Sequence, residues 1–210
     1  MITTVISDLG NVILYFDNGI FFKKMTAYCD HSEKQIRELA HIHFDLVILF
    51  DSGKISPHEF YEGTVDRLGA RISEDEFYSV YCDVFSLNSP VFEILKKLRG
   101  KYSLVLLSNT DVCRFAFIKK RFPEILIFDH RLLSFELGIL KPDPAIYLTA
   151  LEKAGARAEE SVFIDDLQEN IDGAAKVGIQ GILYCPETDL EAQLAALGLK
   201  LGDVPQGDTL

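Results

Sequence analysis

Four short stretches rich in Val, Ile and Leu divide the chain, and each of them runs directly into polar residues. They are Thr3–Ile6 before Ser7-Asp8, Leu104–Leu107 before Ser108-Asn109, Val162–Ile164 before Asp165-Asp166, and Ile182–Tyr184 before Cys185. Their apolar residues are continuous rather than alternating, which is typical of strands covered on both faces, as in a parallel sheet. The four stretches therefore predict a parallel sheet whose strands each end at a polar position.

Segments with helix start and stop signals lie between the later strands. One begins at Ser89-Pro90 and ends at Gly100, a second begins at Asp143-Pro144 and ends at Gly155, and a third spans Ile171 to Val177. Proline in the first turn and glycine after the last turn are preferred at helix boundaries. Strands that alternate with helices predict an α/β fold with a Rossmann-like, doubly wound parallel sheet.

Residues 18–87 interrupt this alternation. Three capping-box pairs, Ser32 with Gln35, Ser56 with Glu59 and Ser73 with Glu76, each precede a segment with helical spacing of apolar residues. We therefore predict a helical cap at 18–87, inserted into an α/β core made of residues 1–17 and 88–210. Phe44, Phe50, Phe60, Phe77 and Phe85 are expected to form the core of this cap. His41 and His43 do not share a helix face, so we interpret them as ordinary cap residues.

The overall charge restricts the partners. A net charge of −11 without a Lys/Arg cluster argues against nucleic acid and anionic membranes, because both require a basic surface. The four cysteines are scattered, and the first residues lack the basic segment of a secretory signal, so we expect a cytoplasmic protein. Its apolar stretches are too short to span a bilayer. The sequence favours no particular oligomeric state.

The polar residues at the strand ends form the candidate site, because ligands of open parallel sheets bind at the carboxyl edge of the strands. A carboxylate such as that of Asp8 can attack phosphorus and form an aspartyl-phosphate. Mg²⁺ prefers oxygen ligands, which Asp8, Asp166 and a backbone carbonyl after Asp8 could supply. Two adjacent carboxylates, Asp165 and Asp166, would repel each other unless a cation or hydrogen bonds offset their charges.

Candidate phosphate-binding groups also lie at or near these strand ends. Ser108, with Asn109 and Thr110 at the start of a helix, could bind phosphate oxygens through hydroxyl and backbone N–H groups. These residues are also good helix N-caps, and the two roles are compatible. Lys141 lies just before the helix that opens at Asp143-Pro144, so its ammonium and that helix terminus could meet one anion.

Four segments, taken in order, resemble the motifs of the haloacid dehalogenase superfamily: Asp8-Leu9-Gly10-Asn11-Val12, Leu106–Thr110, Lys141-Pro142 and Phe163–Asp166. More narrowly, the chain resembles the bacterial sugar-phosphate phosphatases of that superfamily and, more distantly, the phosphatase domain of soluble epoxide hydrolase. The match covers nearly the whole chain, and the insertion looks like the four-helix cap of that family, with Phe50–Ser56 similar to a cap signature. The resemblance implies a Mg²⁺-dependent phosphatase acting on a small phosphorylated metabolite such as a sugar phosphate.

The resemblance also implies a role for each site residue. Asp8 would be the nucleophile and a metal ligand, and Mg²⁺ would also bind the carbonyl of Gly10 and the carboxylate of Asp166. The phosphoryl group would be bound by Ser108, Asn109 and Lys141. Asp165 and Asn170 would hold the metal ligands in place.

Gly10 departs from the resembled pattern, which has a second aspartate two residues after the nucleophile. That aspartate protonates the leaving group and then activates water, and losing such a group costs about 10²- to 10⁴-fold in rate. Asp17 is a speculative substitute. Two alternatives remain beside the phosphatase: a weak or inactive binding protein, favoured by Gly10, and a metal-free 2-haloacid dehalogenase, which would leave Asp165-Asp166 without a purpose. A phosphomutase is disfavoured, because it depends on the second aspartate.

Overall fold

A five-stranded parallel sheet, with the strand order β5-β4-β1-β6-β7, forms the centre of the computed structural model, which describes residues 1–202. The strands are β1 (Thr4–Ser7), β4 (Ser103–Ser108), β5 (His130–Leu133), β6 (Ser161–Asp165) and β7 (Gln180–Leu183). Ser7 of β1 pairs with Leu106 on one side and with Ile164 on the other, so these three strands end at the same edge. The predicted α/β fold with a parallel sheet is confirmed; the predicted core beyond residue 202 lies outside the described part of the chain.

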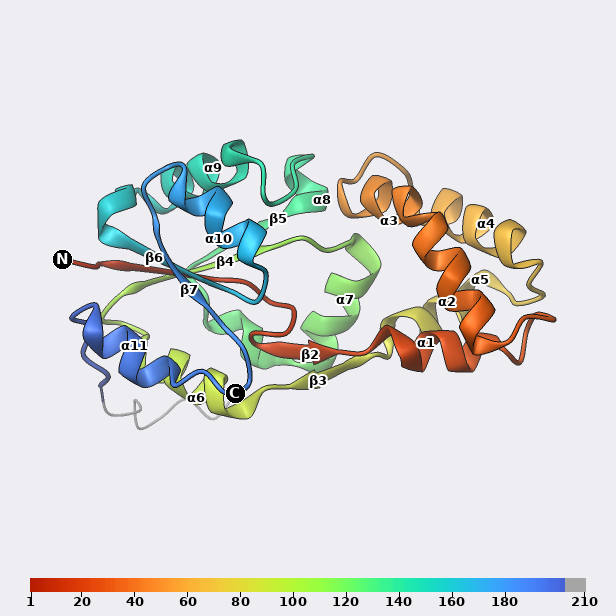
Figure 1. Cartoon of the computed structure of the whole chain (residues 1–210), viewed down its shortest axis with the longest axis horizontal. Coiled ribbons are helices and arrows are strands. Elements are labelled where there is room, and N and C mark those ends of the chain that lie inside the picture. Colours follow the sequence, from red (N-terminus) through yellow and green to blue (C-terminus); the bar gives the residue numbers. More distant parts are fainter. Residues whose placement is uncertain (203–210) are drawn as a thin grey trace.

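Helices cover both faces of this sheet (Figure 1). One face carries α6 (Ser89–Leu98), α7 (Val112–Arg121) and α11 (Leu190–Ala196), and the other carries α8 (Ser134–Leu137), α9 (Pro144–Ala154) and α10 (Gln168–Ala175). Neighbouring strand residues serve opposite faces: Val5 packs with the first set and Ile6 with the second. Two apolar layers around one sheet explain why the strands are apolar throughout.

Five helices occupy the segment between residues 18 and 82: α1 (Asn18–Met25), α2 (Glu33–Ile42), α3 (Phe44–Asp51), α4 (Pro57–Leu68) and α5 (Glu74–Cys82). Ser32 and Ser56 form complete capping boxes, and Ser73 accepts a hydrogen bond from the backbone N–H of Glu76. Phe50, Phe60 and Phe77 are buried in a hydrophobic cluster of the helical segment, separate from the two clusters that flank the sheet. The expectation for Phe44 is wrong, because its side chain is 55% exposed.

A two-stranded antiparallel ribbon joins the helical segment to the sheet, and the sequence analysis missed it. Its strands are β2 (Leu14–Phe16) and β3 (Phe85–Leu87), with Phe16 opposite Phe85. Two short 3₁₀ turns, Pro123–Ile127 and Ala158–Glu160, complete the elements. No helix among residues 1–202 is both long enough and apolar enough to cross a membrane.

The helical segment touches the core at a seam opposite this ribbon. Ser134 of the core hydrogen-bonds through its Oγ to the carbonyl of Asp51 at 2.6 Å and accepts from the N–H of Thr110 at 2.9 Å. Gly53, at φ +65°, lies so close to Phe135 that an added Cβ would sit 2.3 Å from the Phe135 carbonyl oxygen. The seam therefore connects the end of α3 to the loop that follows β4.

Candidate active site

Three carboxylates converge at the edge of the sheet where β1 and β6 end. One oxygen each from Asp8, Asp165 and Asp166 lies within 4.8 Å of the others. Asp8 is 7% exposed and Asp165 is fully buried, while Asp166 is half-buried. The strand register produces this arrangement, because Asp8 and Asp165 directly follow the paired residues Ser7 and Ile164. The structure therefore brings together the two aspartates expected to share a cation.

Lys141 supplies the cationic group of this cluster. Its Nζ lies 2.6 Å from Asp8 Oδ1 and 2.7 Å from Asp165 Oδ2, and its side chain is 1% exposed. Burial acts to lower the pKa of Lys141, but the carboxylates of Asp8 and Asp165 outweigh it and raise that pKa. An ammonium has three protons to donate, so Lys141 can hold both carboxylates and still donate to an incoming anion.

Burial dominates the ionisation of the nucleophile candidate. It raises the pKa of Asp8 to about 7, with Asp165 adding to the rise and Lys141 opposing it. Burial likewise raises the pKa of Asp166, against a hydrogen bond from Asn11 that lowers it. A divalent cation between these groups would offset the repulsion that disfavours their charged forms.

Asp165 is held by groups on the helix that follows it. Its Oδ1 accepts from the backbone N–H of Leu167 at 2.9 Å and from Asn170 Nδ2 at 2.9 Å. Asn170 is buried, as expected of a residue that supports a ligand and not of an ordinary amide on a helix surface. Asn11, to which the sequence analysis gave no role, donates from Nδ2 to Asp166 Oδ2 at 3.0 Å. Asn11 has a φ of +52°, in the left-handed region that asparagine tolerates, and this turn directs its side chain in a way that the sequence did not reveal.

Ser108 and Asn109 lie in the loop between β4 and α7. Ser108 is buried at the strand end, where we expected phosphate to bind. The side chain of Asn109 does not face an open phosphate site: its Oδ1 accepts from the backbone N–H of Lys141 at 2.9 Å, and its Nδ2 donates to the Lys141 carbonyl at 3.0 Å. The Asn109 amide thus fixes the backbone that carries Lys141.

Gly10 lies in the turn after β1, beside an aromatic ring. A Cβ added there would lie 3.1 Å from Cε1 of Phe16 and 3.9 Å from Asp8 Oδ2. Phe16 therefore stands next to the place where the second aspartate of the resembled pattern would project. Asp17, the speculative substitute, is instead the N-cap of α1, accepting from the N–H of Gly19 at 2.7 Å.

The donor set fits a magnesium ion. Mg²⁺ takes hard oxygen ligands and is usually held by one or two carboxylates while keeping waters or substrate phosphate oxygens. Asp8, Asp165 and Asp166 each offer one carboxylate oxygen to such an ion. With three carboxylates facing one lysine, the cluster has more negative than positive charge, which a divalent cation would compensate.

A family model described as haloacid dehalogenase-like hydrolase matches residues 2–178. Among curated proteins, the chain is 26% identical over 197 residues to a D-ribitol-5-phosphate phosphatase of Bacteroides thetaiotaomicron, covering 86% of this chain and 90% of that protein. It is 26% identical over 137 residues to a sesquiterpene phosphatase of Aspergillus oryzae, covering 63% of this chain and 69% of that protein.

A third relative, drimenol cyclase of Aspergillus calidoustus, is 22% identical over 92% of this chain, but the chain spans only 36% of its length. Among solved structures, a haloacid dehalogenase family enzyme from Bacteroides thetaiotaomicron in complex with magnesium and inorganic phosphate superimposes with a TM-score of 0.81. That pair is 26% identical and covers 92% of this chain and 99% of the other.

Proposed function

The chain belongs to the haloacid dehalogenase-like hydrolases, and on that basis we propose that it is a magnesium-dependent phosphatase that hydrolyses a small phosphate monoester through an aspartyl-phosphate. The observation that carries the proposal is the convergence of Asp8, Asp165 and Asp166 around the ammonium of Lys141 at the strand ends. The names of two relatives, both phosphatases, and the magnesium and phosphate in a similar solved structure support it.

In this proposal Asp8 is the nucleophile. One of its carboxylate oxygens forms a bond to phosphorus while the bond from phosphorus to the ester oxygen breaks, leaving the phosphoryl group on Asp8. A water then attacks the same phosphorus, the bond between phosphorus and the Asp8 oxygen breaks, and inorganic phosphate leaves with the carboxylate restored. Bound Mg²⁺ would supply charge compensation for the phosphoryl oxygens and the carboxylates together.

Lys141 and the loop after β4 would hold the phosphoryl group. Lys141 Nζ, 2.6 Å from Asp8 Oδ1, lies where negative charge accumulates during the attack. Ser108 would donate its hydroxyl to a phosphoryl oxygen. The side chain of Asn109 contacts the backbone of Lys141, so we assign this side chain a positioning role, while the backbone N–H groups of the loop stay candidates for phosphate binding. Asn11 and Asn170 would keep the carboxylates of Asp166 and Asp165 in place.

Gly10 has no side chain that could donate a proton to the leaving oxygen. We propose that this proton comes from water admitted to the site, so turnover should fall steeply as the leaving group becomes more basic. Sugar phosphates are the substrate class expected from the sequence and match the name of the ribitol phosphatase. Apolar phosphate esters are a second candidate, favoured by the lining of a cavity described below. The cytoplasmic location stays a prediction.

A phosphate-release screen with the purified chain tests this function. The panel would hold acetyl phosphate, p-nitrophenyl phosphate, sugar phosphates and alkyl phosphates, each with Mg²⁺ and with EDTA. We expect release that needs Mg²⁺ and that falls at least about 10³-fold in Asp8→Asn, in which the nucleophilic carboxylate is absent. The matched control is Asp189→Asn, which changes the N-cap of α11, a helix that carries none of the proposed site residues.

Two outcomes would replace the proposal. If the wild-type chain is folded but releases no more phosphate than Asp8→Asn across the panel, the chain is a binding protein. If it instead releases halide from a 2-haloacid in EDTA, the nucleophile acts on carbon and the chain is a dehalogenase.

A further inference from the structure

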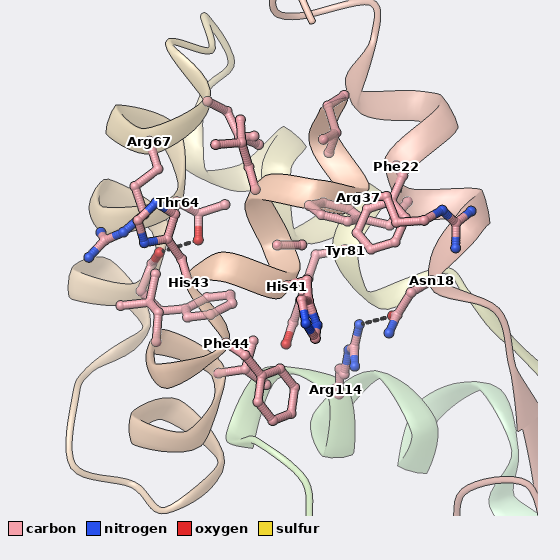
Figure 2. Close-up of a pocket in the computed structure, with 18 residues that line it drawn as sticks. Asn18, Phe22, Arg37, His41, His43, Phe44, Thr64, Arg67, Tyr81 and Arg114 are labelled. Carbon is pink, nitrogen blue, oxygen red and sulfur yellow. Dashed lines mark hydrogen bonds between the residues drawn. The ribbon is translucent and has the colours of Figure 1, made fainter. Parts of the chain in front are cut away.

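A cavity of about 290 Å³ lies between the helical segment and α7 of the core (Figure 2). Its walls come from the five helices α1 to α5, and Arg114 lines it from the first turn of α7. Most of its lining is apolar: Phe21, Phe22, Ile36, Leu39, Ala40, Phe44, Leu46, Val47, Phe60, Leu68 and Tyr81. This volume is near the lower end of the range for small-molecule sites, which is about 300–1,000 Å³.

The polar groups of the lining are largely engaged by the protein itself. Arg37 pairs with Glu33 on its own helix, and Arg67 donates to the carbonyl of Gly63. Arg114 donates from Nη2 to Asn18 Oδ1 at 2.8 Å, as drawn in Figure 2. None of the eighteen lining residues is acidic, although the chain has a net charge of −11. Thr64 donates to the carbonyl of Phe60, which leaves His41 and His43 as the polar lining side chains outside these contacts. The cavity therefore offers few partners for a ligand with many hydroxyl groups.

Arg114 points from α7 into the cavity toward His41 (Figure 2). Its guanidinium carbon lies 4.0 Å from the centre of the Tyr81 ring, and within the described residues its buried Nε has no hydrogen-bond partner. The nearest carboxylate oxygen to that Nε is Asp111 Oδ2 at 4.0 Å. A buried N–H without a partner beside an apolar cavity indicates room for a single polar atom of a ligand.

The cavity lies close to the loop of the proposed phosphate site, because the hydroxyl of its lining residue Tyr81 donates to Asp111 Oδ2 at 3.0 Å, next to Thr110. Helix α7 is capped by Asp111, directly after the Ser108–Thr110 loop, and Arg114 lies three residues further along. At 1.5 Å of rise per residue, three residues correspond to only about 4.5 Å of helix. The loop of Ser108 and the cavity therefore lie at the same N-terminal end of α7.

We propose that this cavity binds the organic group of the substrate and that this group is apolar, an aliphatic or aromatic chain. The inference rests on the proposed phosphatase function and narrows its substrate class. An apolar chain would displace water from Phe44, Leu39 and Val47, which are exposed or half-buried in the lining, and this is favourable in proportion to the area covered. A sugar would lose water from its hydroxyls without gaining enough partners, which disfavours it.

A homologous series of n-alkyl phosphates, from ethyl to octyl, tests the substrate class. The leaving groups have nearly the same chemistry, so differences in kcat/KM report binding of the chain. We expect kcat/KM to rise about fourfold for each added methylene until the cavity is filled. Glucose 6-phosphate, assayed beside them, should be turned over less efficiently than hexyl phosphate. A flat series, or a preference for glucose 6-phosphate, overturns the inference.

Two matched variants locate the effect. Ala40→Phe places a ring in the cavity and should lower the ratio of kcat/KM for octyl over ethyl phosphate by at least tenfold. Ala27→Phe makes the same change at an exposed site of the helical segment outside this cavity and should leave that ratio unchanged. Thermal unfolding of both variants checks that they fold. An unchanged ratio in folded Ala40→Phe overturns the assignment of the cavity.

Binding of n-octylphosphonate, which has no cleavable ester, separates this inference from the proposed function. Calorimetry with Mg²⁺ should show tighter binding than ethylphosphonate in the wild type, and Ala40→Phe should abolish the difference. If the chain dependence of binding is present but no ester is hydrolysed, the phosphatase proposal fails and the cavity assignment stands. If esters are hydrolysed without any chain dependence in rate or binding, the cavity assignment alone fails.

Discussion

The side-chain amide of Asn109 holds the backbone of Lys141 through two hydrogen bonds, accepting from its N–H at 2.9 Å and donating to its carbonyl at 3.0 Å. These residues come from two different motifs, one after β4 and one before α9. Their pairing ties the loop of Ser108 to the lysine whose ammonium lies between Asp8 and Asp165. In the proposed mechanism, this one amide would therefore couple phosphate binding to the nucleophile.

Replacing this amide should reduce turnover more than it reduces substrate binding. In Asn109→Ala both hydrogen bonds to Lys141 are lost, and the displaced ammonium no longer faces the charge formed during attack. We expect kcat to fall about tenfold or more, from a loss of about 1–3 kcal/mol. Steady-state kinetics with acetyl phosphate would measure it. An unchanged kcat accompanied only by a lower melting temperature would contradict a positioning role.

Removing the charge of Lys141 should destabilise the fold itself. Lys141→Met leaves the buried carboxylates of Asp8 and Asp165 facing each other without a cation. We expect the free energy of unfolding to fall by about 3–5 kcal/mol in EDTA, as when one partner of a buried ion pair is deleted. Urea unfolding would measure it against Lys153→Met, an exposed lysine on α9. Equal losses in the two variants would show that the charge of Lys141 is not needed for folding.

The seam carboxylate Asp51 should make stability depend on pH. Burial raises its pKa to about 7; Asp111 raises it further and Arg114 opposes the rise. Between pH 4 and 7 the unfolded chain releases this proton while the folded chain keeps it. The free energy of unfolding therefore falls as pH rises through this interval, by at most about 4 kcal/mol from this group.

Asp51→Asn removes this contribution. Relative to the wild type, the variant should gain stability steadily from pH 4 to pH 7 and keep a constant advantage above it. Urea unfolding of both proteins at pH 5, 6 and 8 gives the difference directly, because other titrating groups cancel. A difference that does not change with pH would mean that Asp51 ionises normally in the folded chain.

Gly53 should be the glycine of the helical segment least tolerant of a side chain. Gly53→Ala and Gly69→Ala both place alanine at a positive φ, of +65° and +56°. Only Gly53 faces a backbone atom, the Phe135 carbonyl oxygen at 2.3 Å from the added Cβ, whereas nothing lies within 4 Å at Gly69. We expect Gly53→Ala to cost about 1–3 kcal/mol more than its control. Equal melting temperatures would contradict the close seam contact.

Position 10 offers a test of the missing proton donor. Gly10→Asp brings back the second carboxylate, but its Cβ would lie 3.1 Å from the Phe16 ring. We expect the double variant Gly10→Asp/Phe16→Ala to speed hydrolysis of alkyl phosphates far more than that of p-nitrophenyl phosphate, which needs no proton to leave. Phe16→Ala alone is the control. Equal changes for both substrates would show that the new carboxylate does not act on the leaving group.

The sequence predicted the central strands and the charged site because both depend on local pattern. Val5 and Ile6 are apolar in succession, and the polar residue that follows each strand reaches the shared edge without further folding information. The edge strand His130–Leu133 was missed, because only two of its residues are apolar. Strands β2 and β3 were missed because three-residue strands have no pattern of their own and form by pairing across the whole inserted segment.

Side-chain partnerships were harder to predict than positions. Lys141 was assigned to phosphate, and the structure adds its contacts with two carboxylates. Asn109 faces Lys141 because a turn 32 residues later comes beside it, which no local pattern reveals. The cavity depends on the facing directions of His41, His43 and Phe44, which helical spacing alone left unresolved.

The ribbon of β2 and β3 is the place where the helical segment can be removed from the fold. Because Phe16 pairs with Phe85, the segment 17–84 begins and ends at neighbouring positions, like the loop of a hairpin. Replacing residues 17–84 with a tight turn would keep strand order in the parallel sheet and all three clustered aspartates. The shortened protein would lose the five helices and the cavity that they form with α7, which would leave the three aspartates at the sheet edge open to larger phosphorylated molecules.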